Sequence, residues 1–248
     1  MKRLLASLGA ALLAALAIPH ANAGIVTSLD DIQFWAGTGS NRTALVIDWN
    51  DGIGSESLAW GYRWSGAAPT VFEMLVGLAG AGSGIHARVD TASGFGPGIF
   101  GLGFQSGAAP FGITGAVDPA GAATVPVFVA GLSDLNTGNS SIQAPLTSTN
   151  ATASNPGDRY AEGWFDNGFW ELFDGIPGTA LTGNWTSNLV GAASPIVPNG
   201  WFAFSITTPD YTSQIPDQPL AAIPEPSTAL LGGLSLLLLA RRRTRPTA

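Results

Sequence analysis

The 248-residue chain contains no cysteine, which excludes disulfides, thiolate metal sites and thiol catalysis. Basic residues are also few. There are ten Lys and Arg residues, and six of them lie in the two terminal segments. Between those segments only four arginines remain, with one histidine, His86, and no lysine. The usual imidazole-based catalytic sets therefore have a single candidate base.

The scarcity of basic residues makes the chain acidic once its terminal segments are set aside. Four arginines against 17 acidic residues, Glu225 included, give a net charge near −13. So negative a chain repels nucleic-acid phosphates and anionic lipids. We therefore expect no nucleic-acid partner.

The N-terminal segment has three parts. A short basic start is followed by an uncharged, Leu- and Ala-rich run over 4–18, and then by Ala21-Asn22-Ala23. This order is typical of a secretory signal peptide with a small-residue cleavage site. The apolar run is shorter than the roughly 20 residues of a membrane span. We expect cleavage between Ala23 and Gly24.

The C-terminal segment carries a second ordered pattern. The motif Pro224-Glu225-Pro226 precedes an uncharged apolar run over 227–240, and an arginine cluster follows it: Arg241, Arg242, Arg243 and Arg245. Positive charge beside a span stays on the cytoplasmic side. As a helix the run is about 21 Å long, short of a hydrocarbon core of about 30 Å. A transient membrane-holding helix is therefore expected.

The motif, the apolar run and the arginine cluster together resemble the PEP-CTERM sorting signal of Gram-negative bacteria, over 223–248. The resemblance implies processing by the membrane protease exosortase and an association with exopolysaccharide or biofilm. It implies nothing about the domain upstream. The expected partners are signal peptidase, exosortase, the membrane and surface polysaccharide. The expected location is the inner membrane for the precursor, then the cell surface or the extracellular space.

These signals divide the chain into a signal peptide (1–23), an exported domain (24–206), a Pro-containing linker (207–222) and the sorting segment (223–248). In the domain, short apolar runs bounded by Gly, Pro, Asn and Asp indicate β-strands. The expected fold is mainly β, an antiparallel sandwich or barrel-like domain. The expected strands are 32–36, 43–49, 57–64, 85–90, 98–104, 124–130, 161–165, 168–173 and 200–206. One short helix is expected over 71–78, between Pro69 and Gly80.

Asn167-Gly168 suggests a hairpin, because this dipeptide supplies the positive φ angles of a type I′ turn. Phe165 would then lie opposite Trp170 as an aromatic cross-strand pair. Four carboxylates flank this turn: Glu162, Asp166, Glu171 and Asp174. Two paired carboxylates can hydrolyse a glycosidic bond, but no spacing here selects a pair.

Trp60, Tyr62 and Trp64 would share one face of a strand, because strand side chains repeat every two residues. Three aromatic rings in line could form a platform for sugar rings. The alternative is an aromatic core stripe, in which large rings provide much of the burial. Arg63 would point to the other face, where Asp48 is a candidate partner.

Asp48, Asn50 and Asp51 provide oxygen atoms in a tight turn closed by Gly52. Calcium prefers such oxygen ligands, so these three residues are the candidate metal site. The alternative is an Asp/Asn/Gly turn whose side chains bond their own backbone. We expect no other cofactor.

The sequence contains neither a Gly-x-Ser-x-Gly elbow nor a His-Glu-x-x-His motif. The first functional expectation is therefore a non-enzymatic cell-envelope or extracellular-matrix protein. The alternatives are a carbohydrate-binding module that uses exposed Trp and Tyr, and a hydrolase of envelope polysaccharides.

Overall fold

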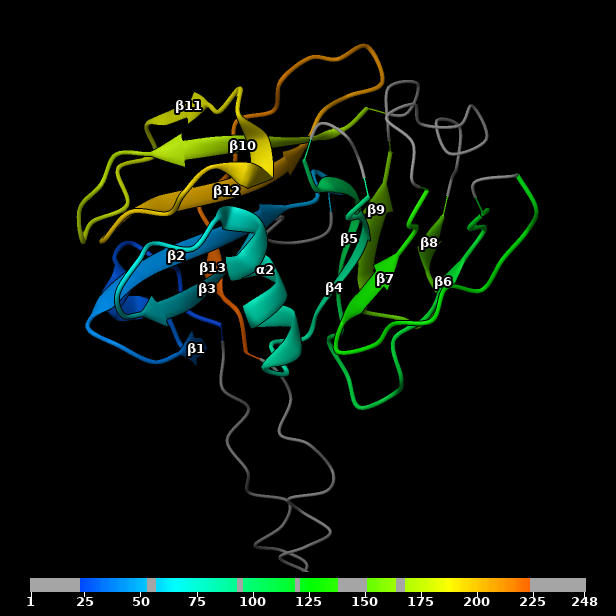
Figure 1. Cartoon of the computed structure of the whole chain (residues 1–248), viewed down its shortest axis with the longest axis horizontal. Coiled ribbons are helices and arrows are strands. Elements are labelled where there is room, and N and C mark those ends of the chain that lie inside the picture. The colour runs from blue at the N-terminus through cyan, green and yellow to red at the C-terminus, as the bar shows by residue number, and fades with distance from the viewer. Residues whose placement is uncertain are drawn as a thin grey trace, which may run out of the picture.

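The computed structural model describes residues 23–52, 57–92, 96–118, 121–137, 151–163 and 168–223. Within these ranges the fold is mainly β, with two larger sheets and one α-helix (Figure 1). A seven-stranded sheet has the order β1-β3-β2-β12-β10-β11, with β13 also paired to β3. A four-stranded sheet has the order β7-β4-β5-β9, and β6 and β8 form a small separate pair.

The seven-stranded sheet takes its strands from both ends of the domain: β1 (Trp35–Gly37), β2 (Asn41–Asp48), β3 (Ser57–Trp64), β10 (Trp170–Gly175), β11 (Trp185–Ser187), β12 (Trp201–Ile206) and β13 (Leu220–Ala221). The other sheets come from the middle: β4 (Ile85–Asp90), β5 (Gly98–Phe104), β6 (Ile113–Thr114), β7 (Leu132–Asp134), β8 (Thr152–Ala153) and β9 (Arg159–Glu162). Two 3-10 turns are η1 (Leu29–Asp31) and η2 (Gly191–Ala193).

The prediction of a mainly β fold is confirmed, but the expected antiparallel pairing holds for only part of the strands. Four strand pairs are parallel: β1 with β3, β2 with β12, β3 with β13, and β4 with β7. Residues 124–130 lie outside the named strands, and in this segment only Val129 forms an isolated bridge, with Leu132. Alternation of apolar residues predicts extended backbone, but it does not identify the partner strand.

The predicted hairpin at Asn167-Gly168 is also wrong. β9 pairs with β5 in the four-stranded sheet, whereas β10 lies between β11 and β12 in the other sheet. Trp170 therefore lies opposite Ile206, and Phe165 falls outside the described residues. The turn propensity of Asn-Gly is a local preference, and the burial of whole strands overrides it here.

The predicted helix is present as α2 (Val71–Gly80). Thr70 and Glu73 form a capping box: Thr70 Oγ1 accepts from the Glu73 amide, and the Glu73 carboxylate accepts from the Thr70 amide. Met74, Leu75 and Leu78 are fully buried. This apolar face packs α2 into the core that both sheets share.

The main core joins the two sheets through tryptophan. Trp49 follows β2, and its indole N–H donates to the carbonyl of Leu102 on β5 at 2.8 Å. Its ring meets Trp60 and Trp170 edge-on at 6.5 Å each. A second apolar cluster, which includes Val46, Phe173 and Ala221, covers other side chains of the seven-stranded sheet. Each sheet therefore has an apolar face to bury, which explains the layered arrangement.

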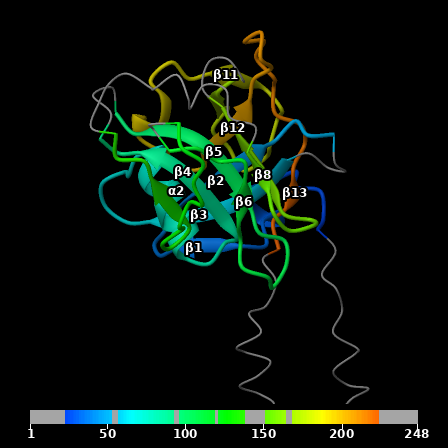
Figure 2. The ribbon, with the colours of Figure 1, turned by 90° about the vertical axis from the view of Figure 1, so that its right-hand side faces the viewer.

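Part of the segment expected to be a linker belongs to the sheet. Ala221 and Ala222 are buried, and the Ala222 amide donates to the carbonyl of Ala59 on β3. The Ala221 amide also donates to the carbonyl of Gly24, at 2.9 Å. The first and last described residues therefore leave the domain on the same side (Figures 1 and 2).

Candidate functional site

The three aromatic residues predicted as a sugar platform do not form one. Trp60 is fully buried and Trp64 is 5% exposed, and both belong to the main core, against which Tyr62 packs. The Trp60 indole N–H donates to the carbonyl of Ser83 at 3.1 Å. The platform prediction is wrong, and the alternative of an aromatic core stripe is confirmed. Period-two aromatic spacing marks a strand face equally well when that face points inward.

The residues predicted as a calcium site form a turn instead. Asp48 is fully buried, and its carboxylate accepts from the backbone amides of Asn50 and Asp217, at 3.0 and 2.7 Å. The Asn50 side-chain amide donates to Ser205 Oγ and to a backbone carbonyl of β12. Asp51 Oδ2 lies 3.9 Å from Nε of Arg159. Among the described residues no group of three or more acidic or histidine side chains is arranged to hold a metal ion.

The expected pairing of Arg63 with Asp48 is wrong, because the two residues lie at opposite ends of the β2–β3 pair. Asp48 lies opposite Ser57, whereas Arg63 lies opposite Arg42. The Arg63 guanidinium instead sits 4.6 Å from the centre of the Trp35 ring.

A buried ion pair crosses the four-stranded sheet at a glycine. Arg88 on β4 and Glu162 on β9 both lie opposite Gly101 of the intervening strand β5. Arg88 Nη1 lies 3.1 Å from both carboxylate oxygens of Glu162, and each side chain is 2% exposed. A Cβ atom at Gly101 would lie 2.1 Å from the Tyr160 hydroxyl oxygen. The missing side chain of Gly101 therefore makes room for a row of buried polar side chains, formed by Arg88, Glu162 and Tyr160.

Tyr160 and Val117 complete the row. The Tyr160 hydroxyl donates to the Glu162 carboxylate, and Arg88 Nη2 donates to the Val117 carbonyl. Burial first, and then the Glu162 charge, raise the pKa of Tyr160 well above its usual value. The row thus fixes the backbone near Val117 to the sheet, and its near-complete burial keeps a ligand out.

His86 lies on the same sheet face, two residues before Arg88. Its ring stacks on Phe111 with centroids 4.0 Å apart, and Phe128 meets it edge-on. Gln105 donates both side-chain amide hydrogens to backbone carbonyls, so its oxygen accepts from Nε2 of His86. Burial lowers the pKa of His86, and the Gln105 hydrogen bond and the Asp158 charge offset part of that effect.

Acidification should therefore weaken the fold through His86. The folded-state pKa lies below the ordinary value of 6.5, so the unfolded chain binds a proton first as the pH falls below that value. We expect the melting temperature to fall between about pH 7 and about pH 5, and to fall less in His86→Gln. Thermal unfolding followed by tryptophan fluorescence measures both. The pKa of Asp31 is also lowered, but protonation of Asp31 affects stability only below its ordinary pKa of 3.8, outside this pH range. An equal fall of the melting temperature in the wild type and in His86→Gln would therefore contradict the role of His86.

The four carboxylates predicted near the hairpin do not converge. Glu162 belongs to the four-stranded sheet, whereas Glu171 and Asp174 lie on β10 of the other sheet. Asp174 accepts two hydrogen bonds from the side-chain amide of Asn188, both at 2.9 Å. Asp166 lies outside the described residues. This arrangement does not support a hydrolytic pair.

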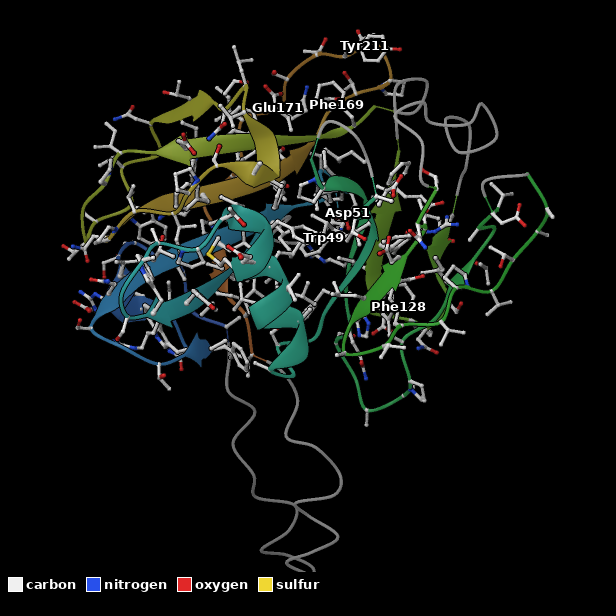
Figure 3. The ribbon with its side chains drawn as sticks, viewed as in Figure 1. Trp49, Asp51, Phe128, Phe169, Glu171 and Tyr211 are labelled. Carbon is white, nitrogen blue, oxygen red and sulfur yellow. The ribbon has the colours of Figure 1, made fainter. Side chains whose placement is uncertain are left out.

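An aromatic pair, in which Tyr211 is exposed and Phe169 is partly buried, lies at one edge of the domain. Phe169 just before β10 and Tyr211 have ring centroids 6.4 Å apart, with planes inclined by 36°. Tyr211 is 49% exposed. Glu171 lies beside this pair in Figure 3 and accepts hydrogen bonds from the hydroxyls of Ser187 and Ser213. Aromatic rings beside a carboxylate offer an apolar face and hydrogen-bond acceptors together, and we take these residues as the candidate site.

Sequence reasoning missed this site for an identifiable reason. Phe169 and Tyr211 are 42 positions apart, and Tyr211 lies in the segment predicted to be a linker. The available signal was an aromatic residue in a Thr-Pro-Asp-Tyr-Thr turn at 208–212, where solubility alone favours a polar side chain.

Within the described residues no helix is long and apolar enough to cross a membrane, and the 227–240 segment lies outside them. The chain matches no protein-family model, no curated protein and no solved structure.

Proposed function

We propose that the chain is an exported, non-enzymatic protein of the cell envelope or extracellular matrix. It enters the export pathway through the signal peptide 1–23, is held at the inner membrane by the helix 227–240, and is then cut by an exosortase. The observation that carries this proposal is the order of Pro224-Glu225-Pro226, the apolar run and the arginine cluster. The flanking charges set the orientation of such a helix, with the domain outside.

The arrangement of the domain's ends supports the proposal. Ala23 and Gly24 are exposed, so a protease can reach the expected cleavage point. Two residues separate Pro224 from the last strand, since β13 ends at Ala221. Removal of both terminal segments would therefore leave every named strand in place. The domain would remain folded after processing, as a matrix protein requires.

Intact-mass analysis of the protein recovered from cells and from the medium tests this proposal. We expect a mature species that begins at Gly24 and has lost the apolar run and the arginine cluster only when the host's exosortase is present. Replacing Pro224, Glu225 and Pro226 by alanine should abolish the second loss. Pro209→Ala, an exposed proline outside the motif, is the matched control.

Two outcomes would contradict this function. A tail that stays intact with and without exosortase would identify a plain membrane anchor. A triple-alanine variant that is processed like the wild type would show that the motif is not recognised.

A further inference from the structure

The turn that carries Tyr211 is tightly bonded. The Tyr211 amide donates to the Thr208 carbonyl at 2.9 Å, and the Thr212 amide lies 3.2 Å from Thr208 Oγ1. The Thr208 hydroxyl also bonds the Asp210 carboxylate. The Thr208 and Thr212 hydrogen bonds lower the pKa of Asp210, so this carboxylate stays ionised. The turn therefore presents Tyr211 from a defined backbone rather than from a flexible linker.

The backbone of Tyr211 is strained, with a φ angle of +64°. Bulky residues avoid this left-handed region, and such strain persists where the surrounding structure enforces it, often at ligand contacts. The strain places a large apolar ring at the surface, next to Phe169. Because the ring is already held, a ligand that stacks on it would lose little free energy to ordering.

Glu171 provides a fixed polar group beside the rings. It is the second residue of β10 and lies two positions after Phe169, which directly precedes the strand. The hydroxyls of Ser187 and Ser213 each donate to one of its carboxylate oxygens. A carboxylate can accept about four hydrogen bonds, so two fixed donors leave acceptor capacity for ligand hydroxyls.

Charge selects among possible ligands. The four arginines of the domain each contact a carboxylate or an aromatic ring elsewhere: Arg42 with Asp30, Arg63 with Trp35, Arg88 with Glu162, and Arg159 with Asp51 and Trp49. No lysine lies between the terminal segments. Phosphates and uronates would therefore meet an acidic surface. A neutral sugar has apolar C–H faces for the rings and hydroxyl donors for the carboxylate.

We propose that Phe169, Tyr211 and Glu171 form a binding site for a neutral pyranose polysaccharide. The two aromatic rings stack on one sugar ring or on two neighbouring ones, and Glu171 accepts hydrogen bonds from the sugar hydroxyls. This inference rests on the proposed function, because export places the domain where such polysaccharides occur. It assigns sugar binding to these residues rather than to the predicted platform, whose Trp60 and Trp64 are buried.

Affinity electrophoresis of the mature protein recovered from cells tests the site. The gels contain hydroxyethylcellulose, dextran, the host's own purified exopolysaccharide or anionic alginate. We expect retardation in at least one neutral gel or in a gel of neutral host polysaccharide, and none in alginate. Tyr211→Ala should weaken binding about tenfold or more, as expected for loss of an aromatic contact. Tyr211→Phe keeps the ring and should bind within about threefold of the wild type.

Val125→Ala is the matched control, because Val125 is 79% exposed and belongs to a different part of the fold. It should bind like the wild type, whereas Glu171→Gln should bind more weakly.

The proposal would be overturned if the wild type is not retarded in any neutral gel, if it binds alginate alone, or if Tyr211→Ala binds as the wild type does. A Tyr211→Ala variant that changes only the oligomeric state in sedimentation would overturn it too. Intact mass of the same variants reports tail processing separately, so loss of binding with normal processing leaves the proposed function standing.

Discussion

Replacing Glu162 by glutamine should lower the free energy of unfolding by about 3–5 kcal/mol, the usual cost of breaking a buried ion pair. The change leaves the Arg88 charge 2% exposed and without its carboxylate. Nε of Arg88 already has no hydrogen-bond partner among the described residues, so the guanidinium depends on Glu162 and on the Val117 carbonyl. Urea unfolding followed by tryptophan fluorescence measures the loss.

A double replacement separates the charge from the packing. Arg88→Met combined with Glu162→Leu removes both charges and keeps similar volumes. Such a swap of a buried pair is often neutral or stabilising, so we expect the double variant to recover most of the lost stability. A Glu162→Gln protein within about 0.5 kcal/mol of the wild type would show that water reaches the pair.

Local sequence signals predicted the elements of the fold well where burial and propensity agree. The helix over 71–78 appears as α2, with the Thr70–Glu73 capping box that its first turn contains. The apolar runs over 57–64 and 85–90 appear as β3 and β4 with the same bounds. These segments carry their own start and stop signals, so their existence does not depend on distant partners.

The pairing of strands was less predictable, because it depends on contacts between segments that lie far apart in the sequence. β2 pairs in parallel with β12, which lies more than 150 residues later. β13 is only two residues long and was hidden in a Pro-rich segment. What makes it a strand is its hydrogen bonding with Gly24 and β3, which no local propensity could indicate.

The ion-pair row had a sequence signal that went unused. His86-x-Arg88, Gly101-x-Gly103 and Tyr160-x-Glu162 are three period-two pairs on β4, β5 and β9, although the third strand was predicted to begin only at residue 161. Aligned side by side, they place bulky polar residues on both sides of a glycine strand. Strand glycines often mark a close approach of neighbouring groups. By contrast, the aromatic site joins Phe169 to a turn residue and needed the tertiary structure.

Replacing Trp60 by alanine should cost about 3–5 kcal/mol of unfolding free energy, because the side chain is fully buried. Trp60 contacts Phe104 of the second sheet edge-on at 5.7 Å, so its loss opens a cavity between the sheets.

Trp185→Ala, at a partly buried tryptophan of β11, is the matched control and should cost clearly less. Urea unfolding of both variants and of Trp60→Phe makes the comparison.

If Trp60 were instead an exposed sugar-binding residue, Trp60→Ala would unfold like the wild type. That outcome would contradict the core position of Trp60 and return the β3 aromatics to consideration as a polysaccharide surface. Loss of stability with unchanged retardation of the folded Trp60→Phe protein in neutral polysaccharide gels would instead leave Phe169, Tyr211 and Glu171 as the binding site.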